Sequence, residues 1–186
     1  MAASLFGGLI GLAACGTFTY IPGSWGSLTG SGASDSSAYT TEADADGIAP
    51  RLTLTSPASG DSYTLGGTYT FSVRWTPASG DTPPSSAVIT FHKQGTLTAD
   101  GNGVAKILDG STELLEMDSS NNLIAGATQL ISDITCTVSL SLQSDGTYLG
   151  TGSFTTNTLS TTYNSSNSTV TSVRESFTVS DMVAGS

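Results

Sequence analysis

The sequence predicts an all-β fold, an antiparallel β-sandwich preceded by an extended N-terminal arm that is first apolar and then of low complexity. Apolar and polar residues alternate with period two in several short segments, as in strands that are buried on one face only. Turn-forming pairs such as Ser59-Gly60, Ser79-Gly80 and Asp145-Gly146 separate these segments. No segment has the period of an amphipathic helix, and only 11% of the residues are charged, which suits strands and turns better than surface helices.

The predicted strands lie between residues 51 and 181. The clearest alternation occurs in residues 69–76 (YTFSVRWT), 87–91 (AVITF) and 134–142 (ITCTVSLSL), with further strands expected around 52–54 and 173–179. Trp75 ends an apolar face and is expected in the core, whereas His92 follows on a polar face and is expected to point to solvent. Residues 113–117 (ELLEM) fit either a strand or one helical turn, and we favour the strand.

Residues 1–50 differ in composition and are expected to form an arm and tether, separate from a sandwich of residues 51–181. Residues 1–21 are apolar and glycine-rich, and residues 22–50 are dominated by Gly, Ser, Ala and Asp, which cannot build a core of their own. We expect the arm to dock on neighbouring subunits, with residues 17–21 (TFTYI) pairing with a neighbour's strand edge. The expected docking residues are Leu5, Phe6, Leu9, Ile10, Leu12, Phe18, Tyr20 and Trp25.

Residues 12–15 (LAAC) match the L-x-x-C tetrapeptide of bacterial lipoprotein signals, in which the cysteine, here Cys15, is lipidated. Residues 1–8 contain no Lys or Arg, whereas a functional signal peptide has a positively charged first region. We therefore favour a retained arm over a lipoprotein signal, and we expect membrane association only if Cys15 is lipidated. Asn164 and Asn167 begin glycosylation sequons, which matter only in a secretory route that glycosylates proteins.

The charge balance disfavours two classes of partner. The chain has 15 Asp and Glu residues against 5 Lys and Arg residues, a net charge of −10. Binding to nucleic acid requires clustered Lys and Arg to neutralise phosphates, and so does binding to an anionic membrane surface. We therefore expect neither partner.

The sequence also predicts no enzymatic activity and no small-molecule substrate. Gly60-Asp61-Ser62 is similar to the start of a serine-hydrolase block, but the only histidine, His92, is expected on a solvent-facing strand position. There is no CxxC, HExxH, P-loop or GxGxxG motif.

One acidic segment offers a weak calcium site. Glu42, Asp44 and Asp46 precede Gly47 and match the first half of a calcium loop, but the twelfth position is Thr53 instead of a bidentate Glu. The segment fits either weak Ca²⁺ binding or an acidic, solvated linker, and no other cofactor is expected.

Two stretches carry a family resemblance. Residues 52–77 (LTLTSPASGDSYTLGGTYTFSVRWTP) and 174–179 (RESFTV) resemble the opening and closing strands of the Ser/Thr-rich immunoglobulin-like (Ig-like) domains of fungal cell-wall proteins and their bacterial surface counterparts. The similarity covers roughly residues 51–180, and residues 95–130 depart from it and look like an insertion. The resemblance implies an antiparallel Ig-like β-sandwich that serves as a wall, adhesion or spacer module without catalytic residues.

Two functions are expected on these grounds. The first is a non-enzymatic structural subunit of a large homo- or hetero-oligomeric protein assembly, such as a virion decoration, neck or fibre-type protein, with the arm docked and the sandwich projecting outward. The second is an exported cell-surface or extracellular filament protein or lipoprotein with an adhesive or spacer Ig-like domain. The first places the protein in a virion, and the second places it outside the cell or on its surface.

Overall fold

The computed structural model describes residues 16–32, 39–43, 49–55, 61–101, 105–109, 112–114, 127–163 and 168–185. These residues are all-β, as predicted, and every strand pairing is antiparallel. The strands are β1 (Thr17–Gly32), β2 (Tyr39–Ala43), β3 (Pro50–Thr55), β4 (Ser62–Thr76), β5 (Ser86–Gly101), β6 (Ala105–Asp109), β7 (Thr112–Leu114), β8 (Ala127–Ser139), β9 (Ser141–Leu142), β10 (Tyr148–Tyr163) and β11 (Ser168–Gly185).

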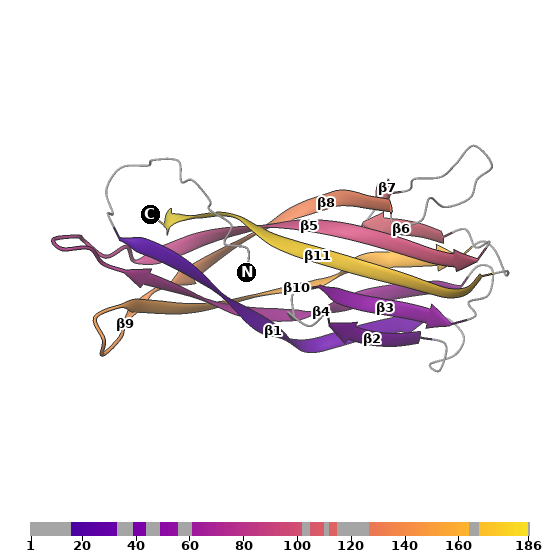
Figure 1. The fold of residues 1–186 in the computed structure, drawn as a ribbon, viewed down its shortest axis with the longest axis horizontal. Coiled ribbons are helices and arrows are strands. Elements are labelled where there is room, and N and C mark those ends of the chain that lie inside the picture. The colour runs from indigo at the N-terminus through magenta and orange to yellow at the C-terminus, as the bar shows by residue number, and fades with distance from the viewer. Residues whose placement is uncertain are drawn as a thin grey trace.

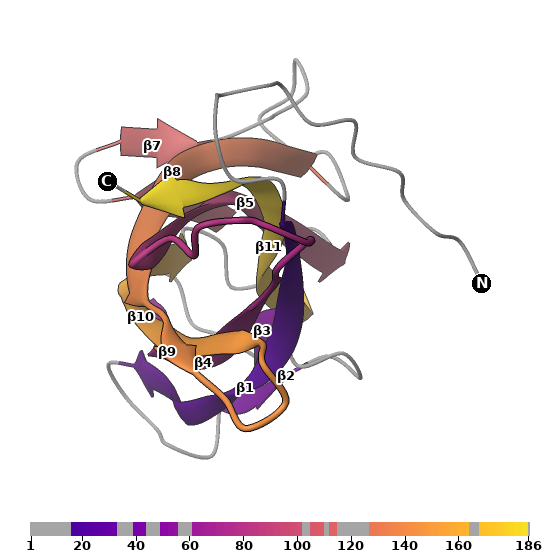
Figure 2. The ribbon, with the colours of Figure 1, turned by 90° about the vertical axis from the view of Figure 1, so that its left-hand side faces the viewer.

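The strands form two sheets that face each other (Figures 1 and 2). One sheet has the order β1-β4-β10-β6-β7, with β9 also paired to β10, and the other has the order β2-β3-β11-β5-β8. Residues 95–130, the expected insertion, contribute the end of β5, then β6 and β7, and the start of β8. Their described part therefore extends both sheets. Residues 113–114 of ELLEM belong to β7, in agreement with the favoured strand, and residues 115–117 lie outside the described residues.

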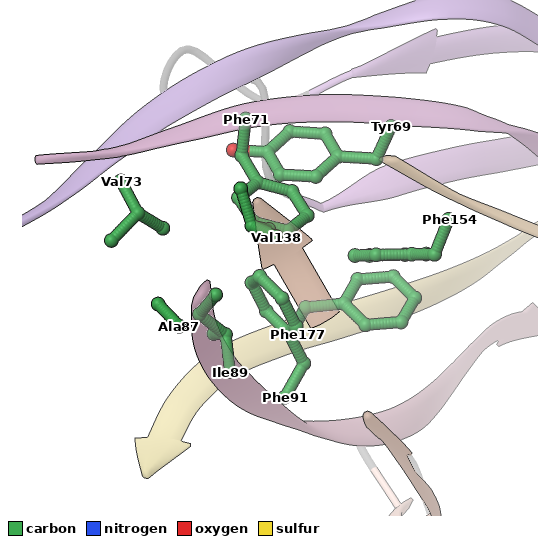
Figure 3. Packing of buried hydrophobic residues seen from close by; sticks show 9 residues of the cluster. All are labelled: Tyr69, Phe71, Val73, Ala87, Ile89, Phe91, Val138, Phe154 and Phe177. Carbon is green, nitrogen blue, oxygen red and sulfur yellow. The ribbon is translucent and has the colours of Figure 1, made fainter. Parts of the chain in front are cut away.

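The core lies between the sheets and is rich in aromatic rings (Figure 3). Because side chains alternate along β4, its inner face carries Tyr69, Phe71, Val73 and Trp75, all of them 0–1% exposed. The predicted core position of Trp75 is therefore confirmed. β10 of the same sheet adds Phe154, and the inner faces of β5, β8 and β11 form the opposite wall, which consists of Ala87, Ile89, Phe91, Val138 and Phe177.

The segment Thr17–Gly32 corrects the predicted arm. It is an edge strand of its own sheet, paired with β4 from Thr17 opposite Thr76 to Gly32 opposite Tyr63. This pairing uses one edge of β1, so the pairing of residues 17–21 with a neighbouring subunit stays a prediction for the other edge, and the described sheets begin at Thr17, ahead of residue 51. Phe18, Tyr20 and Trp25 pack against the core of the same chain, because Phe18 and Tyr20 are alternate residues and the register shift between Ile21 and Ser24 returns Trp25 to the inner face.

The strand predicted at residues 134–142 is also divided. β8 ends at Ser139, and Ser141–Leu142 pairs with β10 in the opposite sheet. The chain crosses between the sheets at Leu140, whose backbone N–H donates to the Ser85 carbonyl at 3.0 Å. Leu142 is consequently 64% exposed and does not lie in the predicted inward position.

Two predicted turns are confirmed by the backbone. Gly80 and Gly146 have φ angles of 89° and 80°, a left-handed conformation that glycine adopts at little cost. Gly146 lies in the turn between β9 and β10, where Gly146 N–H donates to the Gln143 carbonyl at 3.1 Å.

Both terminal strands meet the same end of the sandwich. Thr17 at the start of β1 is opposite Thr76, and Gly185 at the end of β11 is opposite Ser86. Thr76 and Ser86 flank the connection 77–85, so we call this the 77–85 end, which lies at the left of Figure 1. Residues that precede Thr17 and residues that follow Gly185 therefore join the sandwich at one end.

Replacement of Trp75 tests the packing of the core. Trp75→Ala should lower the free energy of unfolding by about 3–5 kcal/mol, the usual range for a buried aromatic side chain. Arg74 lies on the outer face in a surface ion pair, so Arg74→Ala should cost about 1 kcal/mol or less. Urea denaturation measures both changes, and a Trp75→Ala midpoint equal to that of the parent would contradict the assigned inner face of β4.

Candidate functional site

Among the residues whose side chains the structure describes, Lys93, Glu175 and Thr156 form a buried polar cluster between the inner faces of the two sheets. Lys93 Nζ lies 3.0 Å from Glu175 Oε1, and the two side chains are 3% and 0% exposed. Thr156 Oγ1 donates a hydrogen bond to the same Oε1 at 3.2 Å. Lys93 and Glu175 belong to one sheet and Thr156 to the other, so the Lys93–Glu175–Thr156 cluster joins the two sheets through the interior.

The strand alternation explains why charged residues reach this position. Lys93 follows Phe91 by two residues on β5, and Glu175 precedes Phe177 by two residues on β11, so both occupy inward positions. In the register of these strands Lys93 is opposite Phe177, and Glu175 is opposite Gly95. Because Gly95 has no side chain, the Lys93 side chain can extend across to the carboxylate.

The cluster adjoins the aromatic core. Phe154, two residues before Thr156 on β10, has its ring centroid 5.1 Å from that of Phe177 (Figure 3). Removing two charges from water costs several kcal/mol for each ion, and mutual attraction offsets this only in good geometry with further hydrogen bonds. The contact with Thr156 provides such a bond, and the cluster is therefore a specific polar arrangement beside the aromatic core.

A second polar contact joins β1 to β4 through hydrogen bonds to the Tyr69 hydroxyl. The hydroxyl groups of Tyr20 and Tyr69 lie 3.0 Å apart, and the Gly23 N–H donates to Tyr69 Oη at 2.8 Å. Burial, and then the hydrogen bond to Tyr69, raises the pKa of Tyr20 well above its ordinary value. The Tyr20 hydroxyl therefore stays protonated, which keeps this contact uncharged.

The outer faces are polar mainly through hydroxyl groups. Facing pairs across strands include Thr68 with Thr155, whose Oγ1 atoms lie 2.9 Å apart, and Thr53 with Ser172 at 3.3 Å. Such cross-strand pairs each stabilise a sheet by a few tenths of a kcal/mol up to about 1 kcal/mol. The Ser and Thr residues on the outer faces therefore make the surface polar and also support strand pairing.

The residues considered for catalysis lie in separate surroundings. His92 Nδ1 lies 2.5 Å from Asp133 Oδ1 on the outer surface, and its side chain is 45% exposed, which confirms its predicted orientation. Asp61 instead accepts a hydrogen bond from the Tyr63 hydroxyl at 3.1 Å. Each of these carboxylates thus has a structural partner of its own.

Several predicted site residues lie outside the described residues. Of the calcium candidates, Glu42 belongs to β2, where only its backbone is described, and Asp44 and Asp46 are not described. Other predicted site residues are also not described. They are Cys15, the two sequon residues Asn164 and Asn167, and the docking residues Leu5, Phe6, Leu9, Ile10 and Leu12. Among the residues that are described, no three metal-ligating side chains gather into a site.

The alternation of β5 and β11 is the signal that could have revealed the buried cluster. The predicted strands at 87–91 and 173–179 include Phe91 and Phe177, and the same alternation, followed for two positions along each face, reaches Lys93 and Glu175. A charged residue in phase with apolar neighbours on a strand indicates either a strand end or a buried partner.

No protein-family model matches the sequence, and no curated protein is significantly similar to it. The resemblance to Ser/Thr-rich Ig-like domains stays a prediction. The described part of the chain holds no helix with the length and hydropathy of a membrane span.

Removal of one charge from the buried pair should be costly. Lys93→Met leaves the Glu175 carboxylate buried without its ammonium partner, and we expect a loss of about 3–5 kcal/mol in the free energy of unfolding. The double variant Lys93→Met/Glu175→Leu should recover most of this loss, because apolar groups then fill the site. A double-mutant cycle from urea denaturation checks the coupling, and strictly additive losses would contradict the pairing.

The turn between β9 and β10 offers a pH-dependent test. Thr147 Oγ1 and its backbone N–H donate to Asp145 Oδ1 at 2.7 and 3.0 Å, and Arg74 Nη1 donates to Oδ2 at 2.9 Å. These bonds, the Thr147 hydroxyl first, hold the pKa of Asp145 below its ordinary value of 3.8. A lowered carboxyl pKa stabilises the fold above the unfolded-state pKa, and this contribution is lost as pH falls through the folded-state pKa.

We therefore expect Thr147→Val to raise the pKa of Asp145 towards its ordinary value, whereas Thr147→Ser, which keeps the hydroxyl, should leave it low. NMR titration of the Asp145 side-chain carbonyl measures both variants. Equal pKa values in the parent and in Thr147→Val would show that the hydroxyl is not the dominant donor.

Proposed function

We propose that this chain is a non-enzymatic structural module whose sandwich is held at one end to a neighbouring subunit and projects away from it. The observation that supports this proposal is the position of Thr17 and Gly185, which both lie at the 77–85 end. A spacer within a linear string of domains needs its two connections at opposite ends. A module connected at a single end is better suited to be displayed than to bridge.

The dimensions of the sandwich suit a projecting body. β4 has 15 residues and β10 has 16, and at about 3.3 Å per residue each strand spans roughly 50 Å. β4 and β10 pair along most of this length, from Tyr148 opposite Trp75 to Thr162 opposite Ser62. A sheet paired over such a distance provides a stiff support for whatever lies at its far end.

The attachment is assigned to the segment that precedes β1. Residues 1–15 carry Leu5, Phe6, Leu9, Ile10 and Leu12 and no charged residue. Exposed to water, this apolar segment would be an unfavourable patch for a soluble monomer, so burial against a partner is expected. A virion decoration, neck or fibre-type subunit in a homo- or hetero-oligomeric assembly fits this arrangement.

A second function is favoured by the position of Cys15. The L-x-x-C tetrapeptide at residues 12–15 ends two residues before Thr17, where β1 begins. Lipid attached to Cys15 would hold the sandwich at the same 77–85 end, now against a membrane. The chain would then be an exported lipoprotein or cell-surface protein with an Ig-like adhesive domain, and the mass of the intact chain distinguishes it from an unmodified subunit of 18.8 kDa.

Two truncations test the proposal. Removal of residues 2–15 should leave the melting temperature nearly unchanged, because β1 and its pairing with β4 remain intact, but should abolish co-sedimentation with the assembly or membrane. Removal of residues 2–32 should unfold or strongly destabilise the sandwich, because Phe18, Tyr20 and Trp25 leave the core. A chain without residues 2–15 that is still incorporated at normal occupancy would contradict the assigned attachment.

A further inference from the structure

The Lys93–Glu175–Thr156 cluster holds an amine and a carboxyl group in contact inside the protein. We propose that Lys93 and Glu175 become joined after folding by an intramolecular amide bond between Lys93 Nζ and Glu175 Cδ. The inference goes beyond the proposed function, and it does not depend on how the module is attached.

The geometry meets the requirement for reaction between two held groups. Lys93 Nζ is 3.0 Å from Glu175 Oε1, an atom bonded directly to Cδ, so the amine is held beside the carbon that it would attack. The two residues stand on strands that pair from Ser168 to Gly185, which fixes their approach. Both side chains are at most 3% exposed, so bulk water neither separates them nor competes for the carbonyl carbon.

The chemistry balances without any further reactant. A proton passes from the Lys93 ammonium to Glu175 Oε1 along their hydrogen bond and then to Oε2, which gives a neutral amine and a neutral acid whose carbonyl oxygen is Oε1. The nitrogen lone pair attacks Cδ, the Nζ–Cδ bond forms, and the bond from Cδ to Oε2 breaks. Oε2 leaves as water with the acid proton and one proton from the nitrogen, and nothing is oxidised or reduced.

Thr156 supports the step at the oxygen that remains. Its Oγ1 donates to Glu175 Oε1 at 3.2 Å, and Oε1 is the atom on which negative charge develops when the amine attacks. In the product the same hydroxyl can donate to the amide carbonyl. Thr156 is thus a positioning residue that serves both the reacting pair and the product.

Burial also favours the product over the starting pair. The ion pair carries two desolvated charges, whereas an amide is neutral and needs only hydrogen bonds. The described surface pairs lack this combination. Arg74 with Asp145 and His92 with Asp133 have side chains that are 37–55% exposed, and neither pair contains an alkylamine.

Tryptic digestion of the full-length folded protein tests the proposal directly. The chain has five cleavage sites, after Arg51, Arg74, Lys93, Lys106 and Arg174. An amide at Lys93 blocks cleavage there, so mass spectrometry should find residues 75–106 joined to residues 175–186, lighter by one water than the two peptides together. The intact chain should likewise be one water lighter than its sequence.

Separate peptides 75–93, 94–106 and 175–186, together with the full sequence mass, would overturn the proposal. Lys93→Arg is the matched control, because it keeps a positive charge and a tryptic site but offers no alkylamine, and its digest should contain these three peptides without cross-linking. Should this variant fail to fold, the digest of the parent protein alone decides the matter.

Discussion

The contact on which the rest of the structure depends is the packing of aromatic rings between the two sheets. The Phe154 ring centroid lies 5.1 Å from those of both Phe91 and Phe177, and 5.5 Å from that of Tyr69. These four rings come from β10, β5, β11 and β4, each of which has a neighbouring strand on both sides in its sheet. Aromatic groups of this size dominate core energetics and accept few arrangements, so their contact sets how the sheets face each other.

The edge strand β1 completes this packing from the side. Tyr20 packs against Phe71 and Phe91 with ring centroids 6.0 and 5.7 Å away, and Trp25 lies 5.3 Å from Tyr69. The alternation of inner and outer side chains along β1 is interrupted between Ile21 and Ser24 and between Trp25 and Ser27, where the register with β4 shifts. With its Pro, Gly and Ser residues, β1 has the composition of a tether, and only its distant partner β4 makes it a strand.

The difference between a local pattern and pairing with a distant segment explains which predictions from the sequence succeeded. Faces of single strands follow from local alternation, so the buried Trp75, the solvent-facing His92 and the glycine turns were predictable. Pairing between distant segments is not a local property. The crossing at Leu140 and the meeting of Lys93 with Glu175 depend on the register between strands, which a period of two does not specify.

β11 links the interior of the sandwich to its connected end. It pairs with both β3 and β5, carries Phe177 into the core and Glu175 into the buried cluster, and reaches Gly185 at the 77–85 end. Force applied beyond Gly185 would separate β11 from β5 pair by pair, beginning at Ser86. Separation that reached Phe177 would open the aromatic core, and separation that reached Glu175 would expose a charge bound to Lys93. The Lys93–Glu175 contact, whether ionic or covalent, therefore lies where it would resist further separation of β11 from β5.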